Sequence, residues 1–360
     1  MSGSGVTDPA LGSSAPLVSI VVPSFNGARY LREALDSLVG QTYPRTEILV
    51  MDDASTDETE EIVDSYGDAV SHHRQSETRG IYENANDGIA LARGEFVAVY
   101  HADDVYHPEI VEREVSYLTA HAEVGAVFCK HIYINAEGRT YGQHELPEEL
   151  SSGESLAYAA VLRALLRHKN CFLGCPSAMV RASVYRELGT YDQTRFRNTA
   201  DLEMWVRIAR HHPLAVIDEH LYRYRRGHGS SSERYRARRT DPERFFEILD
   251  LELARGGREL VDDETLAAYE AHRAEDQLKM VASNYILSRV GGARAALDAV
   301  RVRRILSSGQ VRRTRLLALA AMMHTLVRLP RIPLAASWLD RRIFDPRTPP
   351  PWPDSGSSVS

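Results

Sequence analysis

Apolar runs alternate with stretches of helically spaced apolar residues along the first 130 positions. Continuous apolar runs of this length are typical of buried parallel strands, and apolar residues three and four apart are typical of helices packed on a sheet. The runs predict strands at 17–22, 47–51, 69–73, 96–100 and 124–129. The spaced stretches predict helices at 29–39, 57–66, 82–92 and 108–120. This alternation predicts an α/β fold: a doubly wound, mainly parallel sheet with helices on both faces.

The pattern changes in the second half and at both ends of the chain. Residues 236–345 contain apolar positions at helical spacing, for example Phe245, Ile248, Leu249 and Leu253, and predict a helical C-terminal appendage. The tails 1–15 and 346–360 are rich in Gly, Ser and Pro and are expected to be disordered.

Composition and charge exclude several classes of protein. The 360 residues carry 43 Lys and Arg against 50 Asp and Glu, so the net charge of −7 argues against a nucleic-acid binder. Three cysteines, Cys129, Cys171 and Cys175, are too few for a disulfide framework and lack the partners of a zinc site, so we expect reduced thiols. The N-terminal residues have no basic start or apolar stretch, and no apolar run reaches a membrane span, which predicts a cytoplasmic protein.

Polar residues follow three of the predicted strands directly. They occupy 23–27, 52–57 and 101–104 and include two adjacent carboxylate pairs, Asp52 with Asp53 and Asp103 with Asp104. Ligands of such sheets bind beyond the carboxyl ends of the strands. Adjacent carboxylates repel unless a cation or hydrogen-bond donors compensate, and oxygen ligands suit Mg²⁺ or Mn²⁺, which would bridge a diphosphate. The alternative is that these residues cap the following helices.

The common nucleotide signatures are absent from the sequence. No G-x-G-x-x-G follows the first strand, and no G-x-x-x-x-G-K-[ST] occurs. Three other stretches, in order, read VSIVVPSFNGARYLREALDSLVGQTYPRTEILVMDDASTDET, RGIYENANDGIALARGEFVAVYHADDVYHPE and CPSAMVRASVYRELGTYDQTRFRNTADLEMWVRI. Together they resemble the blocks of a family-two glycosyltransferase.

This resemblance implies a GT-A domain over 16–235, with a nucleotide-sugar binding half at 16–130 and an acceptor half at 131–235. It also implies a nucleotide-diphosphate sugar donor, a divalent metal (Mn²⁺ or Mg²⁺) and transfer to an acceptor hydroxyl with inversion. The acceptor would be a saccharide or a lipid-linked saccharide in polysaccharide or glycoconjugate biosynthesis.

The resemblance also implies roles for residues of the nucleotide half. Pro23, Ser24 and Phe25 match positions that line the nucleotide, and Asp53 matches the residue that hydrogen-bonds the base. Arg79 is placed to reach a phosphate. The alternatives are core packing for Phe25 and a solvated loop arginine for Arg79.

The family's D-x-D element falls on the HADD sequence at 101–104. Asp103 takes the metal-binding position, and Ala102 lies among the nucleotide-binding residues. His101 replaces the usual first Asp, so the ribose contact would pass to Asp104 or to the imidazole of His101 itself.

The third block implies the catalytic base. Inverting transfer needs a group that takes the proton of the acceptor hydroxyl, and Asp201 matches that position. Glu203 is the competing carboxylate, and a helix N-cap is the structural alternative for Asp201. Residues 222–230 resemble a flexible segment that closes over the diphosphate, with His228 as the metal or phosphate contact.

Two other classes of function stay open. A sugar-nucleotide nucleotidyltransferase uses a related sheet, but PSFNGARY is not the Gly-rich, Arg-containing loop of those enzymes. A non-catalytic binding module with this fold would not need Asp53, Asp103 and Asp201 together.

Charge is unevenly distributed near the C-terminal end. No acidic residue lies between Asp298 and Asp340, and eight arginines lie in 299–339. The apolar stretch 316–323 is too short to span a bilayer. The segment therefore predicts either a helix at the surface of an anionic membrane, on its inner face, or an ordinary amphipathic helix packed on the protein.

Overall fold

The computed structural model describes residues 15–151, 153–227, 239–298, 300, 310–328 and 332–344. The chain forms two compact units: Met1–Tyr158 with Cys171–Arg225, and Ala159–Asn170 with Arg226–Ser360. The predicted boundary at 235 falls in 228–238, outside the described residues, and the division lies earlier, where the last strand ends. Residues 159–170 interrupt the first unit because their helix packs with the second.

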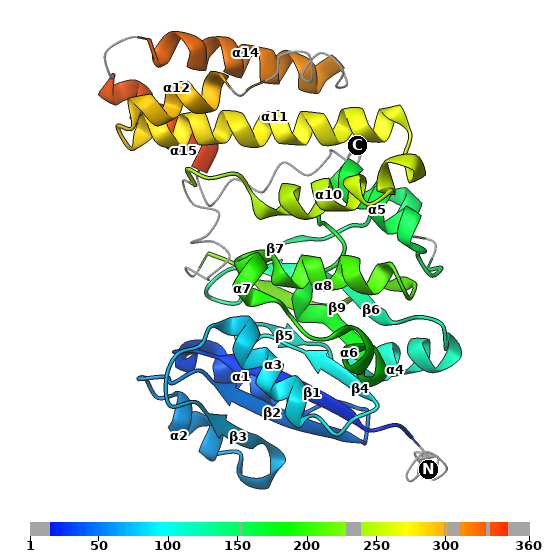
Figure 1. The fold of residues 1–360 in the computed structure, drawn as a ribbon. Coiled ribbons are helices and arrows are strands. Elements are labelled where there is room, and N and C mark those ends of the chain that lie inside the picture. Colours follow the sequence, from blue (N-terminus) through cyan, green and yellow to red (C-terminus); the bar gives the residue numbers. More distant parts are fainter. Residues whose placement is uncertain are drawn as a thin grey trace, which may run out of the picture. The chain divides into compact units, whose positions relative to one another are not determined.

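The first unit is built on one mixed sheet of nine strands (Figure 1). The order is β3-β2-β1-β4-β8-β6-β9-β5, with β7 beside β6. Strands β1, β2, β3 and β4 are parallel, β8 runs antiparallel to β4 and β6, and β6 is parallel to β9. The strands are β1 (Val18–Ser24), β2 (Thr46–Asp52), β3 (Ser71–Arg74), β4 (Phe96–Val99), β5 (Val105–Tyr106), β6 (Ala126–Ile134), β7 (Thr140–Gln143), β8 (Ala178–Arg181) and β9 (Leu214–Arg225).

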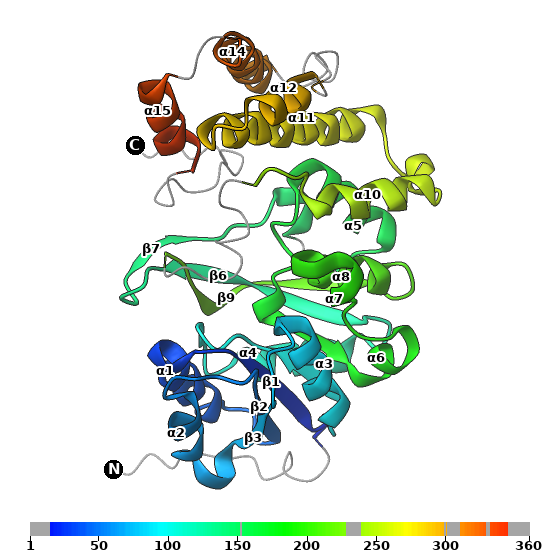
Figure 2. The ribbon, with the colours of Figure 1, turned by 60° about the vertical axis from the view of Figure 1, so that its left-hand side comes forward.

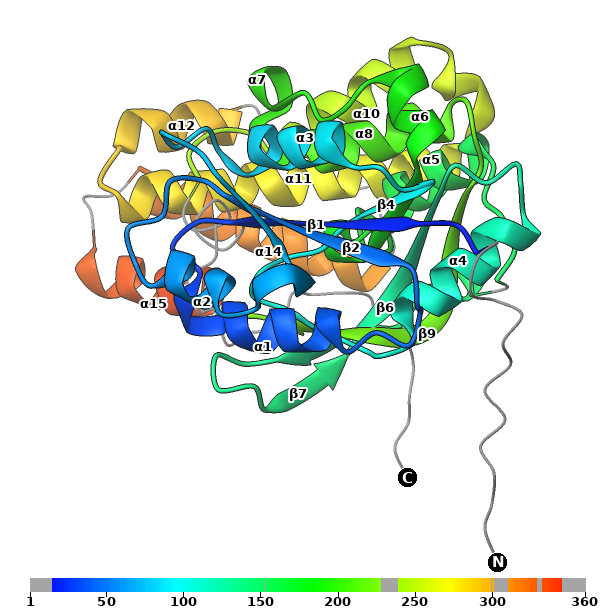
Figure 3. The same ribbon diagram turned by 90° about the horizontal axis from the view of Figure 1, so that it is seen from below.

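Helices cover both faces of this sheet. Figure 3 shows α1 and α2 on one side of β1 and β2 and α3 on the other, as the doubly wound pattern predicts. The helices of the unit are α1 (Ala28–Val39), α2 (Thr59–Asp64), α3 (Ile81–Leu91), α4 (Ile110–Ala120), α6 (Ala182–Leu188), α7 (Gln193–Phe196) and α8 (Ala200–Ala209), with short 3-10 turns between them.

The buried faces explain why these residues form these elements. All seven residues of β1 are buried, as expected for a central parallel strand. Helix α1 buries Leu31, Leu35 and Leu38, spaced three and four apart, on the same core. Helix α3 approaches the sheet at Gly88, where an added Cβ would lie 2.4 Å from Val21 Cγ1. Any larger residue there would push the helix away from the strand.

The second unit is helical, as the spacing of apolar residues predicts (Figure 2). Two apolar clusters join α11 to α12, α14 and α15. Leu316 and Met323, the two ends of the predicted apolar stretch, are buried in these clusters. Its helices are α5 (Tyr158–His168), α10 (Arg244–Ala254), α11 (Asp263–Ile286), α12 (Val290–Asp298), α14 (Gln310–Leu326) and α15 (Pro333–Phe344).

Helix α15 has two different faces. Ala336 and Leu339 pack into the apolar cluster, whereas Leu334 is 82% exposed and Trp338 is 52% exposed, one turn apart.

None of the described helices is both long enough and apolar enough to cross a membrane. The three cysteines are free thiols, with Cys129 and Cys175 buried and Cys171 half-buried.

Candidate active site

The loops that follow β1 and β2 interlock at the carboxyl edge of the sheet. The amide of Asn26 donates to Ser55 Oγ (2.8 Å), and Asn26 Oδ1 accepts from the amide of Thr56 (2.8 Å). Asn26 and Ala54 have φ of 49° and 60°, a left-handed backbone that non-glycine residues adopt at a cost. Strain of this kind persists where the surrounding contacts enforce it, often at functional sites.

The first carboxylate pair is compensated by protein donors. Asp53 is 3% exposed; its Oδ1 accepts from the amide of Arg79 (2.7 Å) and its Oδ2 from that of Gly80 (2.9 Å). Asp52 Oδ1 accepts from the amide of Ser55 (2.9 Å). Asp52 Oδ2 is buried without a hydrogen-bond partner among the described residues, 3.8 Å from Arg74 Nε, so the charge of the pair is compensated by amides and a nearby guanidinium. Capping is done by Asp57, which accepts from the amides of Ala28 and Thr59 at the starts of α1 and α2.

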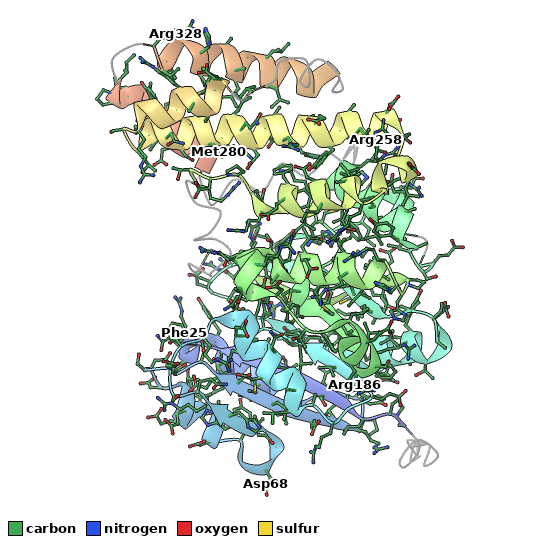
Figure 4. All side chains as sticks on the ribbon, in the orientation of Figure 1. Phe25, Asp68, Arg186, Arg258, Met280 and Arg328 are labelled. Carbon is green, nitrogen blue, oxygen red and sulfur yellow. The ribbon has the colours of Figure 1, made fainter. Side chains whose placement is uncertain are left out.

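Four of the predicted nucleotide contacts lie around this edge. Phe25 is 52% exposed at the surface of the unit (Figure 4), so core packing is excluded for its ring. Ser24 is buried beside it, and its Oγ has no hydrogen-bond partner among the described residues. Pro23, the residue before it, lies within β1 in register with Met51. The guanidinium of Arg79 pairs with Asp87, so it is not a freely solvated side chain.

The second carboxylate pair lies in a cluster suited to a cation. Ligand atoms of His101, Asp103 and Asp104 lie within 4.8 Å of one another. Burial lowers the pKa of His101, which keeps the imidazole neutral, the form that binds metals. Burial, and then the charge of Asp103, raises the pKa of Asp104 well above its usual range. Asp104 is fully buried, and its Oδ2 has no hydrogen-bond partner in the described part of the chain.

This donor set fits a hard divalent cation. Two carboxylates and an imidazole are acceptable ligands for Mn²⁺, and carboxylates also suit Mg²⁺. A cation at the cluster would satisfy Asp104 Oδ2 and would favour the ionised form of both carboxyl groups.

Two side chains hold the backbone of the HADD turn. The Tyr106 hydroxyl accepts from the amide of His101 (2.5 Å), and its ring stacks on Tyr100 with centroids 4.4 Å apart. Arg225, the last residue of β9, donates from Nε to the carbonyl oxygen of Asp103 (2.8 Å). Ala102 is buried within the turn. The turn is therefore fixed in place by protein contacts before any ligand is present.

Asp201 lies near the start of α8, as the sequence predicts. The N-cap position is taken by Thr199, so the capping alternative for Asp201 is wrong. The carboxylate lies near Tyr82 and Cys175: desolvation and then the charge of Asp201 raise the pKa of the Tyr82 phenol well above its usual range, and the pKa of Cys175 is also raised by burial and then by Asp201. Asp201 thus lies against α3, the helix that follows the Arg79 and Gly80 amides.

Glu203, the competing carboxylate, is engaged elsewhere. Its Oε2 accepts from Arg207 Nη2 (3.0 Å), and the same guanidinium donates to the carbonyl oxygens of Leu188 and Thr190. Glu203 therefore helps to join α8 to the end of α6.

Sequence reasoning missed the residues that link Asp201 to the nucleotide edge. Gln193 accepts from the amide of Tyr82 (3.0 Å) and donates to the carbonyl oxygen of Arg79 (2.8 Å), while Asn86 makes two hydrogen bonds with the backbone of Tyr191. Asn86 lies in the second of the matched stretches and Gln193 in the third, but an amide side chain carries no signal of its own in a single sequence.

The segment 222–230 is only partly as predicted. Tyr222–Arg225 belongs to strand β9, so this part is not a flexible segment but pairs with β5 and β6. The signal was available, because tyrosine and arginine alternate there with the period of a strand. His228 lies outside the described residues, and its predicted contact stays a prediction.

The chain is similar in sequence to a known family and to several curated proteins. Residues 19–189 match the model of the family described as glycosyl transferase family 2. A Rickettsia typhi protein described as an uncharacterized glycosyltransferase is 32% identical over 199 residues, covering 54% of this chain and 59% of that protein. The chain spans between 35% and 59% of the length of the first three curated relatives that it matches.

Solved structures show the same fold. TarS 1–349 of S. aureus in complex with UDP superposes with a TM-score of 0.56 and 18% identity, covering 87% of this chain and 89% of that one. The mannosyltransferase PcManGT of Pyrobaculum calidifontis, in complex with GDP-Man and Mn²⁺, has a TM-score of 0.51 and 19% identity, covering 91% of this chain and 87% of that one. The predicted GT-A fold is confirmed.

Proposed function

We propose that this chain, whose residues 19–189 match the model of glycosyl transferase family 2, moves a sugar from a nucleotide-diphosphate donor to the hydroxyl of a saccharide acceptor. The observation that carries this proposal is the cluster of His101, Asp103 and Asp104 at the carboxyl edge of the sheet, with a buried carboxylate oxygen lacking a partner among the described residues. A cation bound there would face the diphosphate of the donor.

The donor would lie along the edge formed by the β1 and β2 loops. Phe25 offers an exposed ring to the nucleotide, and Ser24 offers an unused hydroxyl. Asp53 binds two backbone amides through its two oxygens, and each carboxylate oxygen has a further lone pair for the base. A structural relative bound to UDP and another bound to GDP-Man support a nucleotide donor.

Asp201 would act as the general base in a single displacement. Its carboxylate takes the proton of the acceptor hydroxyl as that oxygen attacks the anomeric carbon, and the nucleoside diphosphate leaves from the opposite side. This path inverts the anomeric configuration. The ion pair of Glu203 with Arg207 supports Asp201 as the base, since Glu203 is already committed to a structural contact.

His101, Asp103 and Asp104 would hold Mn²⁺ or Mg²⁺. When bound, the metal would act as a Lewis acid that stabilises the charge of the departing diphosphate. The Mn²⁺ in the structural relative from Pyrobaculum supports this assignment.

The transferase activity is tested with sugar nucleotides. Purified protein with Mn²⁺ is incubated with UDP-, dTDP- and GDP-sugars, with and without oligosaccharide acceptors. We expect one donor to release nucleoside diphosphate and a glycosylated acceptor to form. Pyrophosphate formation from sugar phosphate and nucleoside triphosphate would instead indicate a nucleotidyltransferase, and donor binding without turnover would indicate a non-catalytic module.

We also propose peripheral contact with an anionic membrane through 299–339, on its inner face, with the exposed side of α15 in contact with lipid. Most arginines of the segment lie outside the described side chains, but the segment carries eight of them. The apolar stretch 316–323 contributes packing to the helical unit, whereas Leu334 and Trp338 are exposed one turn apart. Tryptophan at a bilayer interface beside basic residues is the usual arrangement of peripheral helices.

Sedimentation with vesicles tests this contact. The protein should pellet with vesicles that contain anionic lipid, and binding should weaken in high salt because exposed charges are screened. The double variant Leu334→Ser, Trp338→Ser should bind more weakly, while Leu260→Ser, at another exposed leucine, should not change binding. No binding by the intact protein would contradict the proposal.

A further inference from the structure

Arg225 contacts three parts of the first unit besides its own strand: the HADD turn, helix α1 and the residue that follows β6. Its side chain is 2% exposed although it ends a strand at the edge of the candidate site. Its amide donates to Asp104 Oδ1 (2.8 Å) and its Nε to the carbonyl oxygen of Asp103 (2.8 Å). The same residue thus holds both carboxylate-bearing positions of the HADD turn.

The far end of the guanidinium is anchored on two other elements. Nη2 donates to Glu33 Oε2 on α1 (2.5 Å), and Nη1 donates to the carbonyl oxygen of Asn135 at the end of β6 (3.3 Å). The group also lies over the ring of Tyr30, 4.4 Å from its centroid. Each of its three nitrogens therefore already donates to a protein oxygen.

These contacts indicate that Arg225 holds other residues in place and does not bind a ligand itself. A guanidinium placed to bind phosphate would be open to the site, whereas the side chain of Arg225 is buried and each of its three nitrogens donates to a protein acceptor. Because the planar fork fixes several acceptors at once, a lysine would keep the charge but could not reproduce the three contacts.

We propose that Arg225 is a positioning residue for the divalent cation: it fixes the Asp103–Asp104 turn against α1 and the end of β6, and so sets the affinity of the cluster for metal. This inference rests on the proposed metal role of Asp103. It assigns Arg225 no contact with the donor or the acceptor.

The strand offers a matched control. Arg223 lies two residues earlier on β9 and donates from Nη2 to the carbonyl oxygen of Gly138 (2.5 Å), in the hairpin that follows β6. Its backbone pairs with Val105 of β5, but among the described residues its side chain does not contact the HADD turn. Arg223→Lys removes a comparable arginine from the same strand without touching the metal cluster.

The test measures Mn²⁺ binding directly, with Mn²⁺ alone, from the electron paramagnetic resonance signal of the free ion. Arg225→Lys and Arg225→Met should both bind Mn²⁺ about 10-fold more weakly than wild type, the usual scale for losing a hydrogen-bond partner of metal ligands. Arg223→Lys should bind as wild type does. Glu33→Gln, which keeps an acceptor for Nη2, should lie close to wild type. Excess Mn²⁺ should restore part of the transferase rate of Arg225→Lys.

The outcomes separate this inference from the proposed function. Circular dichroism identifies any variant that does not fold, and Arg225→Lys keeps the test valid if Arg225→Met fails. Equal Mn²⁺ affinity of folded Arg225→Lys and wild type would overturn the positioning role alone. An equal loss in Arg223→Lys would overturn it too, because the effect would then belong to the strand. Absence of Mn²⁺ binding by the wild type would overturn the metal assignment and, with it, this inference.

Discussion

Replacement of Asp201 by asparagine should abolish transfer and leave donor binding intact. The amide has the size of the carboxylate and can keep the contact with Tyr82, but it cannot take a proton from the acceptor hydroxyl. We expect the turnover number to fall on the order of 10³-fold, within the range found for loss of a general base. Steady-state assays of glycosyl transfer measure the rate, and calorimetric titration with the donor measures the binding.

Glu203→Gln is the control for this experiment. The glutamine keeps an acceptor for Arg207, so this variant should fold and retain most of its activity. If Asp201→Asn turned over at the rate of wild type while Glu203→Gln did not, the base would be Glu203 and the assignment of Asp201 would be wrong.

Removal of the divalent cation should also lower the rate of glycosyl transfer strongly, as the Asp201→Asn substitution does. A metal supplies several kcal/mol of stabilisation to the departing diphosphate, and each 1.4 kcal/mol is tenfold in rate, so loss of the ion should cost on the order of 10²-fold or more. Chelator-treated protein should lose transfer and regain it on addition of Mn²⁺ or Mg²⁺. Asp103→Asn should lower the rate to a similar extent and raise the Mn²⁺ concentration needed for half-maximal activity.

Asp68→Asn serves as the matched substitution, since Asp68 is exposed in a 3-10 turn remote in sequence from the HADD motif. It should behave as wild type in both assays. Full activity of the wild type in excess chelator would contradict the metal role of the cluster, whatever the behaviour of Asp103→Asn.

The elements of the first unit were predictable from sequence, but their arrangement was only partly so. Apolar runs and helical spacing locate β1, β2 and β4 within one or two residues, because burial on both faces of a parallel sheet leaves a continuous pattern. The pattern of apolar residues does not show which strands pair with one another. Nothing in the pattern showed that β8 would enter between β4 and β6, running antiparallel to both.

The candidate site, too, was only partly predictable from the sequence. Asp53 and Asp103 stand out in the sequence as carboxylates at strand ends, whereas Asp201 was singled out by its match to the third block of the family. That Asp53 is held by two backbone amides, whereas Asp104 Oδ2 has no partner in the described structure, depends on loops that only the folded chain brings together. Arg225 was passed over because its charge is ordinary in a sequence, and its burial becomes visible only in three dimensions.

Helix α5 has a consequence for the order in which the chain folds during synthesis. It lies in sequence inside the first unit, yet its contacts are with residues made much later: Arg167 Nε donates to Thr265 Oγ1 (2.7 Å), and the carbonyl oxygen of Arg167 bonds His272 Nε2 (2.8 Å). The ribosome adds about 5–20 residues per second, so the apolar side of α5 waits on the order of ten seconds for its partners. During that interval Val161, Leu162 and Leu165, buried in the finished protein, are a target for chaperones, and synthesis that stops before α11 would release a chain with this surface still uncovered.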